Sequence, residues 1–92
     1  MEIDLPVGAK IIRVGDVEGL FYLWAIVNTE EDVPTEKRFL EFYKTGQPIK
    51  TPLKELIYLG ECKLFIMQEL CLYTFENVLK SSLWRTENSQ KN

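Results

Sequence analysis

The stretch Leu20-Phe21-Tyr22-Leu23-Trp24-Ala25-Ile26-Val27 decides the fold of this chain. It is apolar without interruption and rich in aromatic and β-branched side chains, a composition typical of a β-strand. Such a run indicates a strand that is covered on both faces, or one whose second face lies in a subunit contact. It is far shorter than the ~20 apolar residues that cross a bilayer, so we expect a central strand and no membrane segment.

The residues before this strand predict a β-hairpin. Residues 9–14 contain β-branched side chains, and their alternation would place Ala9, Ile11 and Arg13 on one face and Ile12 and Val14 on the other. The segment 15–19 carries two glycines and reads as the turn that joins the two strands. The polar segment 28–36 is a loop, because its Pro34 cannot donate a ladder hydrogen bond.

The rest of the chain predicts further short strands with little helix. The expected strands are 37–43, 57–64 with a bulge at Gly60, and 71–76. Residues 51–56 would form one helical turn that Thr51 caps and Pro52 begins. For residues 65–76 a helix is the alternative to a strand, with 65–68 as the connection in the strand interpretation.

These elements predict one mainly β domain, although an α+β fold is possible. The expected architecture is a small antiparallel meander, barrel or sandwich of four to six strands with at most one or two short helices. The β-rich domain would span residues 1–76, opening with a turn at Leu5–Gly8. Residues 77–92 would form an extension with a short helix to Trp84 and a mobile polar tail from Arg85.

Composition excludes several classes of function. The 92 residues contain no His, 11 basic and 14 acidic side chains, and a net charge of −3. Without His, most proton-transfer and zinc sites are not available. A net negative chain does not favour duplex nucleic acid, which needs a basic face. We therefore expect no metal, no cofactor and no enzymatic activity.

The cysteines and the N-terminus indicate a cytosolic protein. Two cysteines, Cys62 and Cys71, are too few for a disulfide framework, and they would lie reduced on neighbouring strands. Their expected role is structural, because a reactive thiol needs an electropositive site. The acidic start at Met1–Asp4 does not resemble a signal peptide.

Several motifs resemble a family of small phage-encoded proteins of unknown function. They follow one another in the order and approximate spacing of that family, over about residues 3–76: Leu5–Val14, Leu23–Val27, Arg38-Phe39, Thr45–Ile49, Tyr58–Gly60 and Phe75-Glu76. The chain departs from the pattern at Gln47 and Tyr73, where family members often carry His. Proton transfer at those positions is therefore not expected. The extension from Asn77 lies outside the pattern.

The resemblance implies a phage origin, the cytoplasm of an infected bacterial host, and action by binding. One hypothesis is a homo-oligomeric sponge that counteracts host defence by sequestering a small nucleotide immune signal. Aromatic rings would stack on the base, while a cation and glycine-turn N–H groups would hold phosphate. The candidate ligand residues are Trp24, Arg38, Tyr43, Lys44, Thr45, Gly46 and Tyr58. On this hypothesis Arg38→Ala leaves the fold intact and abolishes binding.

The structural alternatives for these residues stay open at this point. Trp24 would pack in the core, Arg38 would be a solvated strand residue, and Thr45-Gly46 would be only a turn. A different function is an inhibitor that binds a host defence protein through an apolar surface or through an acidic one. The acidic surface would be Glu30, Glu31, Asp32 and Glu36, whose spacing does not fit a calcium loop.

Overall fold

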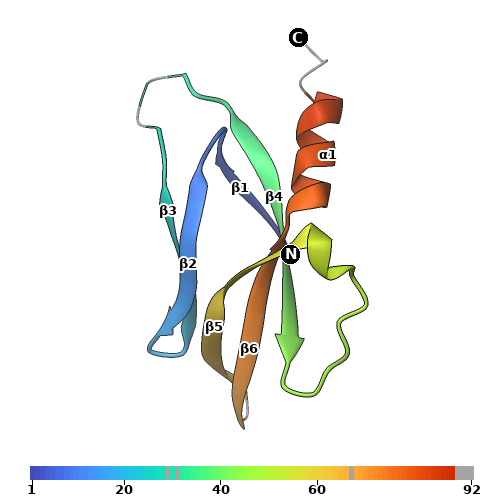
Figure 1. Ribbon diagram of the computed structural model, residues 1–92. Helices are drawn as coiled ribbons and strands as arrows, with labels where there is room; N and C mark the ends of the chain where they lie inside the picture. Colours follow the sequence, from blue (N-terminus) through green and yellow to red (C-terminus); the bar gives the residue numbers. More distant parts are fainter. Residues whose placement is uncertain (29, 31, 67, 89–92) are drawn as a thin grey trace.

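The computed structural model of the chain describes residues 1–28, 30, 32–66 and 68–88, and for 65, 66, 68 and 69 the backbone alone. Within these residues, six strands form two antiparallel sheets (Figure 1). The four-stranded sheet has the order β1 (Glu2–Pro6), β4 (Thr35–Lys44), β6 (Gln68–Asn77) and β5 (Leu56–Ile66). Strands β2 (Lys10–Val17) and β3 (Leu20–Ile26) form a two-stranded ribbon. The expected mainly β class is confirmed.

The ribbon is the predicted hairpin, with a shorter turn than expected. Val17 pairs with Leu20, so only Glu18 and Gly19 connect the strands. Both residues have positive φ, 51° and 78°, as a two-residue hairpin turn of type I′ requires. This turn matches the right-handed twist of the strands and fixes their register.

A bulge in β2 corrects the alternation expected for this strand. The register shifts between Ile11 and Arg13, so one extra residue is inserted at Ile12. As a result Ile11 and Val14 are both buried on one side, although their odd spacing predicts opposite faces. Arg13 then points outward beside Trp24.

The ribbon packs against the four-stranded sheet, and the core lies between them. The buried cluster joins Ile11 and Val14 of β2 to Leu40 and Leu59 of the larger sheet. The half-buried side chains packed around it are Ile3, Leu5, Phe21, Leu23 and Phe42. The chain is thus a small two-layered sandwich, and β3 contributes only one of its faces to the core.

The first strand was not expected, since Leu5–Gly8 reads as a turn. Met1 and β1 nevertheless pair along β4, and Ile3 and Leu5 pack against the core. The alternation of Glu2 and Asp4 with Ile3 and Leu5 was the available signal. The turn itself begins only after Pro6, where Ala9 N donates to Pro6 O at 3.0 Å.

In the described part of the ambiguous stretch 65–76, the chain is strand and not helix. Strands β5 and β6 form a hairpin whose register continues to the pair Ile66 and Gln68. The connection predicted at 65–68 is shorter than expected, because Phe65 and Ile66 belong to β5 and Gln68 begins β6; Met67 lies outside the described residues. The expected bulge at Gly60 is present, because the register shifts between Tyr58 and Gly60.

Two short helical elements complete the fold. A 3₁₀ turn, η1, spans Leu53–Glu55, and α1 spans Val78–Asn88. Thr51 does not cap η1, since Pro52 is its N-terminal flanking residue and makes no side-chain cap. Asn77 caps α1 by accepting a hydrogen bond from Lys80 N at 3.0 Å. The tail predicted from Arg85 is helical as far as Asn88, and residues 89–92 lie outside the description.

Candidate functional site

The candidate ligand residues do not form one site. They fall into three groups: Trp24 on the ribbon, Arg38 inside the larger sheet, and Tyr43, Lys44, Thr45, Gly46 and Tyr58 at the end of β4 and on β5. The third group alone brings several candidates close together. The geometry of each group decides what it can bind.

Arg38 is buried, neither solvated nor free to hold a phosphate. Its Nε and Nη2 donate to Glu76 Oε2 and Oε1 at 2.5 and 2.8 Å, a bidentate pair between β4 and β6. Its Nη1 donates to Ala9 O at 2.6 Å and so also ties the turn before β2 to the sheet. Since these bonds engage all three guanidinium nitrogens, a phosphate would have to displace Glu76.

The Arg38 pair is part of a longer ion network that reaches Arg85 on α1, whose side chain is half exposed. Arg85 on the helix donates from Nε and Nη2 to Glu36 at 2.7 and 2.9 Å, and Glu36 lies 3.5 Å from Arg38 Nη1. Ser81 donates to Glu76 Oε2 at 2.9 Å and accepts from Phe39 N at 3.1 Å. Charges therefore alternate from Arg85 through Glu36 and Arg38 to Glu76.

The electrostatics of this network favour fixed charges over proton transfer. The hydrogen bonds from Arg85 lower the pKa of Glu36, despite burial that opposes this shift. The hydrogen bond to Glu76 raises the pKa of Arg38. Both groups therefore stay ionised at neutral pH, and their role is to join β4, β6 and α1.

Sequence reasoning missed most of this network and treated Glu36 as part of an acidic surface. Glu36 is 1% exposed and fully engaged, so it cannot contribute to such a surface. Glu30 and Asp32 are exposed, and Glu31 lies outside the described residues. The available signal was the spacing of Glu36 and Arg38, since residues two apart share one face of a strand.

A second polar cluster surrounds Glu41 on the other face of β4. Its carboxylate accepts from the Tyr43 hydroxyl, from Thr51 Oγ1 at 2.8 Å and from Asn77 Nδ2 at 2.7 Å. Burial alone would raise the pKa of Glu41, but these hydrogen bonds together lower it. The cluster ties the loop before η1 and the cap of α1 to the sheet.

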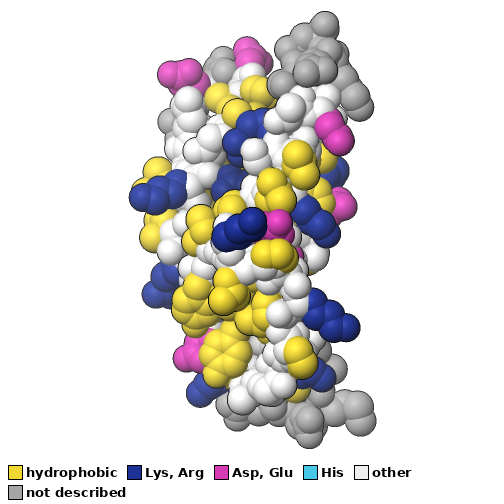
Figure 2. All heavy atoms as spheres, turned by 45° about the vertical axis from the view of Figure 1, so that its right-hand side comes forward, with side chains coloured by type: hydrophobic (Ala, Val, Ile, Leu, Met, Phe, Trp, Pro, Cys, Tyr) yellow, Lys and Arg dark blue, Asp and Glu magenta, His cyan; other side chains and the backbone are white. Residues whose placement is uncertain are grey.

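An aromatic row crosses the same outer face of the larger sheet. The rings of Tyr43 and Phe75 have centroids 5.9 Å apart, and those of Phe75 and Tyr58 5.3 Å apart. Tyr58 is 54% exposed. Figure 2 shows hydrophobic side chains gathered on the lower half of the face it displays, with acidic and basic side chains around them. Burial and then the nearby Glu61 raise the pKa of Tyr58, so its hydroxyl stays protonated at neutral pH.

The turn that follows β4 closes on itself. Lys44 N donates to Gln47 Oε1 at 3.0 Å, and Gln47 N donates back to Lys44 O at 3.0 Å. Gly46 has φ of +82°, which the turn requires. Two N–H groups that could have formed an anion nest are therefore already used, and Gln47 has a structural role.

The outer face of the ribbon exposes several large apolar side chains. Its side chains alternate with those of the core face and are Val17, Leu20, Tyr22, Trp24 and Ile26. Leu20 and Ile26 are 62% and 60% exposed. Trp24 does not pack in the core; it is half-buried, with the Arg13 guanidinium 4.1 Å from its ring centroid. We call these five residues the ribbon face.

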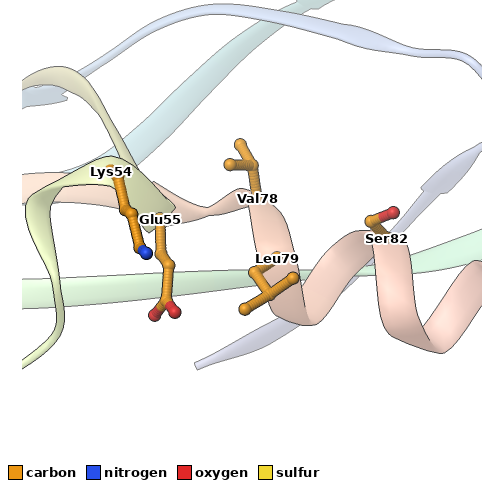
Figure 3. A pocket seen from close by; sticks show the side chains of 5 residues that line it. All are labelled: Lys54, Glu55, Val78, Leu79 and Ser82. Carbon is orange, nitrogen blue, oxygen red and sulfur yellow. The ribbon is translucent and has the colours of Figure 1, made fainter.

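Two depressions in the surface contain none of the candidate residues. One lies at the start of α1 and is lined by Lys54, Glu55, Val78, Leu79 and Ser82, with Lys54 and Glu55 side by side on one wall (Figure 3). The other lies beside the Arg85–Glu36 pair, between the start of β4 and Trp84. Both are partly open to solvent, and neither is an enclosed cavity.

The cysteines have the expected structural setting. Cys62 is fully buried on β5, and Cys71 is half-buried on β6. Burial raises the pKa of both thiols, which keeps them protonated at neutral pH. Among the described residues, no group of three or more acidic or cysteine side chains is arranged to hold a metal ion. None of the helices in that part is long and apolar enough to cross a membrane.

Fold and site define a small β-sandwich protein whose buried charges are structural and whose exposed apolar and aromatic side chains lie on open sheet faces. The chain belongs to the family described as domain of unknown function DUF7352, whose model matches residues 1–83. Arg85 lies beyond the matched residues. Comparison with curated proteins and with solved structures gives no match.

Proposed function

We propose that the protein is a non-catalytic binding module that attaches to another protein through the ribbon face and its exposed neighbour Ile12. The observation that carries this proposal is the exposure of large apolar side chains on one thin element. Leu20, Ile26 and Ile12 are 62%, 60% and 54% exposed, and Tyr22 is 45% exposed. A contiguous apolar surface of this kind on a small domain is typical of an interaction site.

The residue types on the ribbon suit a protein partner better than a phosphorylated small molecule. Tyr22, Trp24 and Arg13 are the side-chain types that contribute most to protein interfaces. The two depressions described above are not lined by any residue of the ribbon face, and a small ligand is usually held in a concave site. The geometry thus favours direct protein binding over capture of a nucleotide signal.

The setting of this function follows from the resemblance to phage-encoded proteins. In that setting the partner is a host defence protein, and the site of action is the cytoplasm of the infected bacterium. Glu36 is buried and bonded to Arg85, so it is lost from the acidic surface, and the apolar surface is the one we assign to the target.

The experiment is affinity capture with matched surface variants. Ile12→Lys/Val17→Lys changes β2 only, and Leu53→Lys/Leu83→Lys changes apolar residues on η1 and α1 that are also exposed. Wild type and the second variant should retain the same host protein, identified by mass spectrometry and then bound again in purified form. The first variant should lose it. Loss in both variants, or in neither, would contradict the proposal.

A second candidate function is the nucleotide sponge, and the aromatic row is the observation that favours it. Tyr43, Phe75 and Tyr58 could stack a planar base, with Lys44 at the end of the same strand for phosphate. Its test is the melting temperature with a panel of cyclic oligonucleotides and cyclic ADP-ribose isomers. A ligand that raises the melting temperature of wild type but not of Tyr58→Ala would support this function over the first.

A further inference from the structure

The edges of the two sheets differ in how well they are protected from pairing with another chain. The β1 edge carries Glu2, Asp4 and Pro6, and Lys37 of the adjacent strand lies 3.2 Å from Asp4. Charged side chains and proline are the usual means by which an edge strand avoids further pairing. This edge is therefore closed to a second chain.

The β5 edge is covered by the ribbon. A Cβ atom placed on Gly60 would lie 2.9 Å from Val14 O, which shows how closely the backbones of β5 and β2 approach. Lys63 N donates to Asp16 Oδ1 at 2.6 Å and adds a hydrogen bond between the same two strands. No room remains there for another strand.

The β3 edge has neither form of protection. In the described part of the chain β3 pairs with β2 on one side and with no strand on the other, and Figure 1 shows it at the margin of the molecule. Its sequence from Leu20 to Ile26 contains no charge, no proline and no glycine, and its register with β2 is unbroken between Trp24 and Leu20. An apolar, regular and open edge is a template for an added strand.

We propose that a second copy of this chain occupies that edge, so that two β3 strands pair antiparallel across a two-fold axis. The two ribbons then form one four-stranded sheet in the order β2–β3–β3–β2. A two-fold axis makes such an edge its own partner, which is why a second copy fits it without any further requirement.

The length of the strand selects the register of this pairing. A register centred on Leu23 uses all seven residues of β3. It places Leu20 opposite Ile26 of the second copy at both ends, and Tyr22 opposite Trp24 of the second copy between them. These four side chains all belong to the ribbon face, and aromatic pairs at opposed positions stabilise antiparallel strands. The edge pairing leaves Ile12 and Val17 on β2 free, so the variants at those two residues test the partner proposed above separately from the pairing of β3.

The test places charges at the two ends of β3. In the proposed register, Leu20→Lys/Ile26→Lys sets like charges opposite each other twice, whereas Leu20→Lys/Ile26→Glu sets opposite charges there. Both variants lose the same apolar side chains, and circular dichroism checks that both remain folded. Sedimentation velocity over a concentration series should show a wild-type dimer, with a dissociation constant about tenfold or more higher in the Lys/Lys than in the Lys/Glu variant.

A mixing experiment separates the proposed pairing from a general effect of net charge. Leu20→Glu/Ile26→Glu and Leu20→Lys/Ile26→Lys should each be monomeric and should form a heterodimer when mixed. Hydrogen exchange should show new protection confined to β3 when wild type dimerises. A wild-type monomer at all concentrations, equal dimerisation of the Lys/Lys and Lys/Glu variants, or unchanged exchange in β3 would each overturn the proposal.

Discussion

At the level of single residues, Arg38 connects several separate parts of the fold through its hydrogen bonds. It joins Glu76 on β6, the Ala9 carbonyl before β2 and Glu36 on its own strand. Removing one member of a buried ion pair leaves the other charge without compensation, which costs about 3–5 kcal/mol. We expect Arg38→Met to lower the free energy of unfolding by an amount of this order, measured by urea denaturation. The earlier expectation that a truncated Arg38 leaves the fold intact is not what this geometry favours.

The double variant Arg38→Met/Glu76→Met is the matched control for that prediction. Replacing both members of a buried ion pair by apolar side chains is often close to neutral. The double variant should therefore be more stable than Arg38→Met alone. If the losses of unfolding free energy in the two single variants add up to the loss in the double variant, the destabilisation comes from packing around Arg38. The uncompensated carboxylate of Glu76 is then not its cause.

The pH dependence of stability should report the engaged carboxylates. The pKa values of Glu36 and Glu41 are lowered in the folded chain, so the unfolded chain binds protons more readily in acid. Their contribution is complete above the unfolded pKa of about 4.3 and is lost as the pH falls through the lower folded values. The melting temperature should fall from about pH 5 to pH 3, and by less in Glu41→Gln than in wild type. If the melting temperature falls by the same amount in both proteins, Glu41 contributes nothing to the pH dependence of stability.

Sequence reasoning identified residue types well but not their partners. That Cys62 is buried follows from the apolar character of a free thiol. That Arg38 meets Glu76 does not follow, because the two residues are 38 positions apart and depend on the pairing of β4 with β6. For the same reason Tyr43 and Tyr58 could be chosen as aromatic candidates, whereas Phe75, which lies between them, could not.

Among the elements, β5 depends on a glycine that allows close packing of the ribbon. Gly60 has φ of +141° at the bulge, and an added Cβ would lie 2.9 Å from Val14 O. Because the neighbour is backbone, it cannot move without displacing β2. We expect Gly60→Ala to destabilise the chain by about 2 kcal/mol or more, measured by thermal and urea denaturation.

Gly8→Ala is the control for the backbone strain in that substitution. Gly8 has φ of +82°, yet nothing lies within 4 Å of its added Cβ. Gly8→Ala should show the cost of a positive φ alone, without a clash with a neighbouring strand. Its loss of unfolding free energy should therefore be smaller than that of Gly60→Ala. Equal losses would mean that the closeness of β2 to β5 is unimportant.

Elements with a strong local pattern were predicted, and those defined by distant contacts were not. The uninterrupted run at Leu20–Ile26 and the glycine bulge in β5 are local signals, and both are present. β1 was not expected, and Leu5–Gly8 reads as a turn, because the short alternation of Glu2–Leu5 indicates a strand only once its pairing with β4 is known. α1 was given only as far as Trp84, because the bonds of Arg85 to Glu36 that join its last turn to the sheet are not visible in sequence.

At the scale of the whole molecule, the two layers cover only one face of the ribbon. The core cluster lies between the ribbon and the larger sheet, so Leu20, Tyr22 and Ile26 remain exposed. A chain of 92 residues has too little interior to bury all its apolar side chains, and association is a direct way to cover the remainder. From the sequence, the second face of β3 lies either in the core or in a subunit contact. The sequence could not decide between them, since both give the same uninterrupted apolar run.

If two copies pair through β3, thermal stability should depend on protein concentration. Each tenfold rise in concentration adds about 1.4 kcal/mol per dimer to the free energy of unfolding, which corresponds to roughly 3–5 °C for a domain of this size. Wild type should show this increase above its dimer dissociation constant, when measured by scanning calorimetry over three decades of concentration. Leu20→Lys/Ile26→Lys should melt at one temperature throughout the same series, because its like charges meet at both ends of the strand pair. A wild-type melting temperature that is equally independent of concentration would mean that the exposed side of β3 is left for a different protein, and capture with the β2 variants would then be the experiment that identifies it.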